Sequence, residues 1–213
     1  MLESLLHAAR PWLAPAFTLW ASPVTWLEIV AFVLSIWMVL CNLRVNPLGW
    51  PLAIVASLLY ALLFVDSRLY GEASLQIVFV IVAFWGWWQW LRGRGGDGGA
   101  LRVHRLSLRG RVLALLTTLS MWPLLGLVLH HMTDSDVPWL DALPTVGSLT
   151  GQFLLGRKLV ENWAVWLVVN AFSIGLFAFK GLWLTVLLYA VFALLSVAGW
   201  RAWGRLSRPD VCA

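Results

Sequence analysis

Polar side chains are scarce in the apolar segments of this chain, and some of them are spaced so that they share one face of a helix. In segment 143–155, Thr145, Ser148 and Gln152 follow one another at intervals of three and four residues. An amide or hydroxyl buried without a hydrogen-bond partner costs about one to several kcal/mol. These groups therefore either join helices to one another or bind a polar ligand.

The next apolar segment, 163–179, repeats this spacing with aromatic and amide side chains: Trp163, Trp166 and Asn170. An amide has four hydrogen-bonding positions, which two small neighbours rarely fill. Glutamine and tyrosine residues elsewhere are further inward candidates: Gln76, Tyr189 and Tyr60. The amides of Gln152, Asn170 and Gln76, together with the rings of Trp166 and Tyr189, predict a binding site that stacks on a planar ring and bonds hydroxyls and an amide. A nucleoside-like solute fits that description.

Enzyme chemistry has weaker support. His130 and His131 are adjacent and point in different directions on a helix, so they make a poor metal site. Segment 92–99 is rich in glycine but lacks the lysine of a phosphate-binding loop. Ionisable residues avoid the apolar segments, which argues against transport coupled to protons or sodium. We therefore expect no catalytic site, no metal and no cofactor.

The amino-acid composition indicates whether the chain is a soluble or a membrane protein. Apolar residues make up 61% of the 213 residues and charged residues 12%, a balance that a soluble domain cannot cover with polar surface. A bilayer core of about 30 Å is crossed by about 20 helical residues. We predict an all-α integral membrane protein with transmembrane helices at 24–43, 50–66, 74–91, 112–131, 143–155, 163–179 and 182–200.

Most of the 15 Lys and Arg residues fall in alternate connections. Because short basic loops stay cytoplasmic, they predict an N-terminus outside and a C-terminus in the cytoplasm. The net charge of +5 thus reports topology, and we do not expect nucleic-acid binding.

Residues 26–91 align without a gap to residues 139–204, at an offset of 113 (139 minus 26). The matches include Trp26 with Trp139, Arg44 with Arg157 and Gly86 with Gly199. Composition alone is a poor explanation for matches in these residue types. The pattern predicts two parallel three-helix repeats joined by an inverting helix, a 3+1+3 plan that resembles the SWEET sugar carriers.

This plan divides the chain into six parts. They are an interfacial N-terminal helix (1–22), the first repeat (23–91), a flexible, basic, Gly-rich cytoplasmic loop (92–111), the linker helix with an acidic outer loop (112–138), the second repeat (139–204) and a cytoplasmic tail (205–213).

With the repeat established, residues 157–183 resemble the signature of the PnuC-type nicotinamide riboside transporters. The most specific part is Glu161-Asn162-Trp163-x-x-Trp166-x-x-x-Asn170. Residues 139–155 (WLDALPTVGSLTGQFLL), Leu69-Tyr70 followed by Leu75-Gln76, and Gly86-Trp87 ahead of Trp90 add to the resemblance. Many relatives have Asp where this chain has Asn170, so direct pairing to a cationic ligand is lost here.

The resemblance implies uptake of nicotinamide riboside, a form of vitamin B3, across a bacterial cytoplasmic (inner) membrane. It implies facilitated diffusion through a central pocket between the repeats, with trapping by cytoplasmic phosphorylation. The nine side chains above would line the pocket, and Trp166 would hold the pyridinium ring by a cation–π interaction. We also expect the protein to form a homo-oligomer, with a trimer as the first guess.

Three alternatives remain open. A SWEET-like carrier for a sugar has the same plan, and related carriers take other vitamins such as thiamine or riboflavin. A structural membrane protein without a solute path would use the same polar side chains only to join helices.

Overall fold

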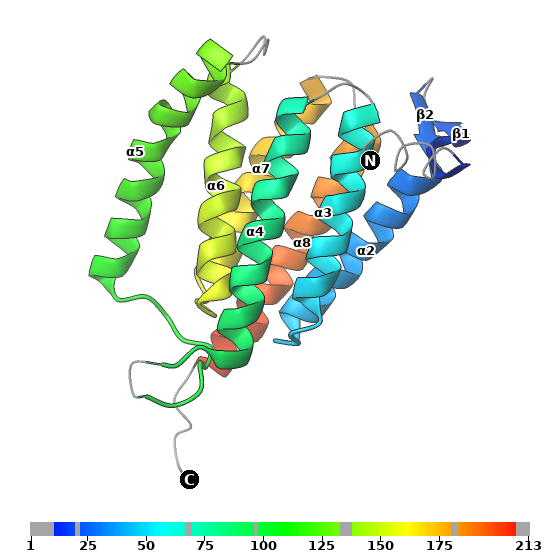
Figure 1. The fold of residues 1–213 in the computed structure, drawn as a ribbon. Helices are drawn as coiled ribbons and strands as arrows, with labels where there is room; N and C mark the ends of the chain where they lie inside the picture. Colours follow the sequence, from blue (N-terminus) through cyan, green and yellow to red (C-terminus); the bar gives the residue numbers. More distant parts are fainter. Residues whose placement is uncertain are drawn as a thin grey trace. The chain divides into compact units, whose positions relative to one another are not determined.

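The structure is a computed structural model that describes residues 11–19, 22–66, 70–95, 98–132, 138–179 and 183–207. Helices dominate these residues (Figure 1): α2 (Trp26–Leu43), α3 (Gly49–Asp66), α4 (Tyr70–Arg92), α5 (Leu108–Met132), α6 (Pro138–Gly156), α7 (Asn162–Phe179) and α8 (Trp183–Leu206). Each predicted transmembrane segment coincides with one of these helices, with ends that differ by a few residues. Five of them, α2, α3, α4, α5 and α8, are long and apolar enough to cross a membrane.

The helix predicted over residues 1–22 does not extend that far: residues 11–13 are helical, but a β-hairpin follows them. Residues 1–10 lie outside the described residues. Strand β1 (Pro15–Leu19) pairs antiparallel with β2 (Ser22–Thr25). Pro15 and Pro23 each lack the N–H that a helix interior needs, and both sit in the first two positions of their strands, where proline is tolerated. The hairpin leads directly into α2, whose first turn Thr25 caps by accepting a hydrogen bond from the Glu28 N–H at 3.2 Å.

The chain divides into two compact units, Met1–Phe84 and Trp85–Ala213. In the first unit, α2 packs against α3. The turn between them holds Gly49 against Asn42, leaving no space for a Cβ atom. This unit carries two of the predicted site residues, Tyr60 on α3 and Gln76 on α4.

In the second unit, α6 contacts both α5 and α7, and α7 contacts α8. The α5–α6 contact is made by Trp122, whose Nε1–H donates to the Trp139 carbonyl at 2.8 Å, and by the hydroxyls of Thr118 and Thr150, 2.9 Å apart. Almost none of α5 is buried within the structure. The acidic outer loop predicted before α6 lies largely outside the described residues.

The loop predicted as a flexible tether is in part an ordered strap, residues 101–107. The His104 N–H donates to the Lys158 carbonyl at 3.1 Å, and the Val160 N–H donates to the His104 carbonyl at 3.0 Å. Lys158 Nζ donates to the Leu101 carbonyl at 3.0 Å and lies 5.1 Å from the ring centre of Trp90. Partial burial lowers the pKa of Lys158.

Glu161 fixes the far end of the strap. Its carboxylate accepts from the Leu106 N–H at 3.0 Å and from Arg111 Nε and Nη2, both at 3.0 Å. Glu161 is 9% exposed, so these charge-assisted bonds replace most of its hydration. α5 begins at Leu108 and not at the predicted 112, and the Ser107 hydroxyl caps its first turn by accepting from the Gly110 N–H at 3.2 Å.

Helix ends in the two predicted repeats correspond closely. Adding 113 to the bounds of α3 gives those of α7, and the same shift brings α2 onto α6 and α4 onto α8 within one residue. α2 and α6 also end alike. Val45 and Lys158 have φ of 55° and 54°, and each starts the pair of backbone bonds that defines a Schellman motif.

Candidate functional site

The three polar residues Thr145, Ser148 and Gln152 of α6, which we call the polar stripe, lie in two different environments. Thr145 is half-buried, and its hydroxyl donates to the Asp141 carbonyl one turn earlier at 2.9 Å. Ser148 is also half-buried. Gln152 is 9% exposed, and its Oε1 has no hydrogen-bond partner among the described residues. A buried amide oxygen without a partner is costly for a fold, so its presence is typical of a binding site.

Trp166 of α7 lies against α6 at Gly151, the residue that precedes Gln152 in the sequence. Its indole packs on Gly151, where an added Cβ would come within 2.9 Å of Trp166 Cε2. Only glycine allows this approach, because any side chain would push the ring away. The half-buried indole is thus held against α6 one residue before Gln152.

Asn170 is 2% exposed, and its Nδ2 donates to Ser196 Oγ of α8 at 3.2 Å. Ser196 in turn donates to the Phe192 carbonyl at 2.7 Å. Sequence reasoning missed Ser196. The available signal was its position seven residues after Tyr189, which places both on one face of α8.

Trp163 has a different environment from Trp166. It is 3% exposed, its ring covers Gly199 of α8, and it meets Trp203 edge to face at 5.6 Å. Its Nε1 is buried and has no hydrogen-bond partner in the described part of the chain. The packing on both sides favours a structural role for this ring.

The other three predicted residues are half-buried. Tyr189 meets Phe192 edge to face at 6.2 Å, and Tyr60 stacks on Phe64 at 6.2 Å. Gln76 lies on α4 in the first unit, as Tyr60 lies on α3. The contacts within the second unit therefore connect Trp166 to α6 and Asn170 to α8.

This arrangement is suited to binding rather than to chemistry. It offers an indole face, a carbonyl acceptor and a hydroxyl–amide pair, and none of these is a nucleophile with a neighbouring base. Among the described residues, no three His, Cys, Asp or Glu side chains are grouped as a metal would need.

Comparison with known proteins places the chain in a family. The family model described as nicotinamide mononucleotide transporter matches residues 25–205. The riboflavin/roseoflavin transporter RibM of Streptomyces davaonensis is 28% identical over 93% of this chain and 94% of its own. The nicotinamide riboside transporter PnuC of Neisseria mucosa is 29% identical over 87% and 74%, and that of Escherichia coli is 26% identical over 68% and 71%.

A solved structure agrees with these matches. The crystal structure of the vitamin B3 transporter PnuC superposes with a TM-score of 0.71 at 27% identity, covering 85% of this chain and 81% of that one. The family model spans most of the chain, and five of the described helices are long and apolar enough to cross a bilayer. The chain therefore belongs to the nicotinamide mononucleotide transporter family, as a multi-pass membrane transporter of the bacterial cytoplasmic membrane and not an enzyme.

Proposed function

We propose that this protein takes up nicotinamide riboside by facilitated diffusion and that a cytoplasmic kinase then traps the riboside as its phosphate. Several relatives are transporters of this riboside, and the solved relative is a vitamin B3 transporter. The ligand has a planar cationic ring, a carboxamide and ribose hydroxyls, which are the three kinds of group that the candidate site can receive.

The half-buried indole of Trp166, which packs on α6 at Gly151, and the buried amide of Gln152 on that helix support the proposal. An indole face attracts a desolvated cation by about 2 kcal/mol, and the partnerless Oε1 of Gln152 is ready to accept from a hydroxyl or a carboxamide N–H. Asn170 is a neutral amide, so the ring charge has no carboxylate partner there, and the indole supplies the attraction.

We further propose that the two three-helix repeats are parallel, with the N-terminus outside, and that they rock about a central pocket. The shared offset of 113 residues in helix ends and the matching φ of Val45 and Lys158 support the duplication. Reporter fusions after α4 and after α8 test the topology. Both should be active only in the cytoplasm, and a periplasmic signal from either would overturn the parallel arrangement.

Substrate identity is tested by binding and by flux. Nicotinamide riboside is titrated calorimetrically into the detergent-purified protein, with nicotinamide, nicotinamide mononucleotide, thiamine and glucose as comparisons. We expect saturable binding of the riboside alone, and counterflow of labelled riboside in proteoliposomes without an ion gradient. Binding of glucose but not of the riboside would replace this function with that of a sugar carrier.

Riboflavin is the second candidate, because the match to the riboflavin/roseoflavin transporter covers nearly all of both chains. Riboflavin has a larger, uncharged ring system and no pyridinium, so its binding would not depend on a cation–π interaction. Stacking on an indole quenches the fluorescence of riboflavin, so a titration followed by riboflavin fluorescence detects binding of this ligand.

We also propose that the protein forms a homo-oligomer, and a trimer is the first expectation. Light scattering in detergent measures the number of subunits.

A further inference from the structure

An apolar crevice of about 470 Å³ lies in the second unit between α5, α6 and α7. Its walls include Ala114 and Leu115 of α5, Leu143 of α6, and Val165 and Phe172 of α7. Thr118 of α5 and Thr150 of α6 also line the crevice, where their hydroxyls lie 2.9 Å apart. We call this crevice the wedge.

This wedge is distinct from the candidate substrate site. On α6 its lining residues Leu143 and Thr150 each lie two positions from a residue of the polar stripe, Thr145 and Gln152 respectively. Residues two apart in an α-helix point about 200° away from each other. The stripe and the wedge thus occupy opposite sides of α6.

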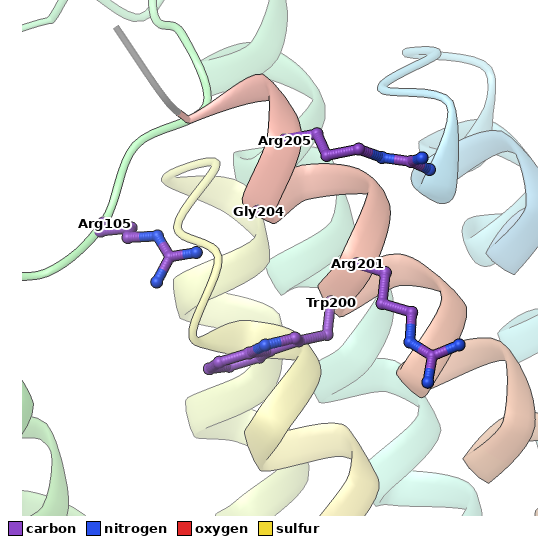
Figure 2. Close-up of a pocket in the computed structure, with 5 residues that line it drawn as sticks. All are labelled: Arg105, Trp200, Arg201, Gly204 and Arg205. Atoms are coloured by element: carbon purple, nitrogen blue, oxygen red, sulfur yellow. The ribbon is translucent and has the colours of Figure 1, made fainter.

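The end of the wedge that lies next to the strap (residues 101–107) is lined by basic residues. Arg111 lines the wedge itself, and Trp200 lines both the wedge and a second cavity of about 570 Å³, which Arg105, Arg201, Gly204 and Arg205 complete. Figure 2 shows Arg105 and the ring of Trp200 on one flank of α8, while Arg201 and Arg205 extend from the other. The wedge therefore joins an apolar cleft to a cationic rim.

Two of these guanidinium groups keep donors for a ligand. Arg105 donates its Nε–H to Ser207 Oγ at 3.2 Å, and Arg111 uses Nε and Nη2 on Glu161. A guanidinium has five N–H donors, so each retains several. Both residues are exposed.

We propose that the wedge is a binding site for an anionic phospholipid, with one acyl chain between α5 and the α6–α7 pair and the phosphate at Arg105 and Arg111. An acyl chain fits the apolar walls, and the basic rim complements the phosphate. In the proposed orientation the rim faces the cytoplasmic leaflet, where anionic lipids attract basic residues. The bound lipid would fill the space that α5 leaves open.

The test uses the full chain purified in detergent and titrated with phosphatidylglycerol or with phosphatidylcholine of the same acyl chains. Retained lipid is counted by native mass spectrometry, and thermal stability is followed in parallel. We expect the wild type to retain phosphatidylglycerol and to be stabilised by it. Ala114→Trp should block the cleft, and Arg105→Gln should weaken retention about fivefold, the effect of one basic residue near an anionic head group.

Matched controls separate the wedge from the general surface. Leu113→Trp places the same ring on the side of α5 that points away from the wedge, and Arg102→Gln removes an exposed charge from the same strap. Both should retain lipid as the wild type does. Equal retention of the two lipids, equal losses in controls and wedge variants, or equal stabilisation by glycerol 3-phosphate would each overturn the proposal. So would dissociation of an oligomer by the wedge variants, because the occupant would then be a second copy.

Discussion

Val45 and Lys158 are the two non-glycine residues with positive φ in the described part of the chain, at 55° and 54°, and they stand 113 residues apart. The Asn46 N–H donates to the Cys41 carbonyl at 2.9 Å, and the Leu159 N–H donates to the Leu154 carbonyl at 3.0 Å. A helix that ends this way usually places glycine at the left-handed position. Here both positions carry side chains, at a cost of about 1–2 kcal/mol each.

Replacing the first of these residues should stabilise the protein. Val45→Gly removes the left-handed strain of a β-branched residue and is expected to add about 1 kcal/mol to the free energy of unfolding, after allowance for the greater freedom of glycine in the unfolded chain. Lys158→Gly also loses the bond to the Leu101 carbonyl and the contact with Trp90, so it should gain less or lose stability. Thermal unfolding in detergent measures both, and a Val45→Gly protein less stable than wild type would refute the strain argument.

The bonds that Glu161 accepts from Leu106 and Arg111 are expected to make the largest polar contribution to the stability of the strap. Glu161→Ala loses three charge-assisted bonds and should cost about 3 kcal/mol. Arg111→Gln leaves the carboxylate nearly buried with only the Leu106 N–H as a described partner, so it should cost a similar amount although Arg111 is half-exposed. Unfolding of the two single variants and the double variant gives the coupling energy. Additive effects would show that the pair does not hold the strap.

Gly199 and Gly175 form a matched pair for close packing. A Cβ at Gly199 would collide with the Trp163 ring, whereas a Cβ at Gly175 meets nothing within 4 Å. Gly199→Ala should therefore destabilise by about 1–3 kcal/mol. Gly175→Ala should stabilise by up to about 1 kcal/mol, since alanine favours helix more than glycine does. The contact between α7 and α8 is wrongly described if both changes have the same sign in thermal unfolding.

Trp166 is expected to dominate binding of the cationic riboside. Trp166→Ala removes a contact of about 2 kcal/mol and should weaken binding about thirtyfold. Trp37→Ala is the control, because Trp37 is 52% exposed on α2, and its loss should leave affinity unchanged. Calorimetric titration of the purified variants measures these affinities. Equal affinities for Trp166→Ala and wild type would remove this residue from the site.

Replacing Gln152 distinguishes a role of this amide in binding from a role in helix packing. Gln152→Leu removes the partnerless buried acceptor, so the protein should be at least as stable as wild type. If the amide binds substrate, the same change should weaken affinity about tenfold, the effect of one lost hydrogen bond of about 1.4 kcal/mol. Lower stability with unchanged affinity would instead assign Gln152 to helix packing.

The sequence by itself determined where the chain forms long apolar helices, because the hydrocarbon core requires helices whose backbone bonds are internal and whose side chains are apolar. It also identified the residue types of the candidate site, since a polar group in such a helix stands out against its neighbours. The N-terminal hairpin was not predicted, because residues 1–22 were expected to form one interfacial helix.

Only the tertiary structure decided which polar groups have partners and which faces are covered. Trp163 and Trp166 share one motif and one spacing, yet Gly199 and Trp203 enclose the first ring while the second stays half-buried against Gly151. Likewise, the binding of Glu161 to the strap and the wedge beside α5 depend on contacts between residues tens of positions apart. Spacing along a helix gives the direction of a side chain, but burial and pairing depend on the neighbouring helix, because close packing is a property of two surfaces together.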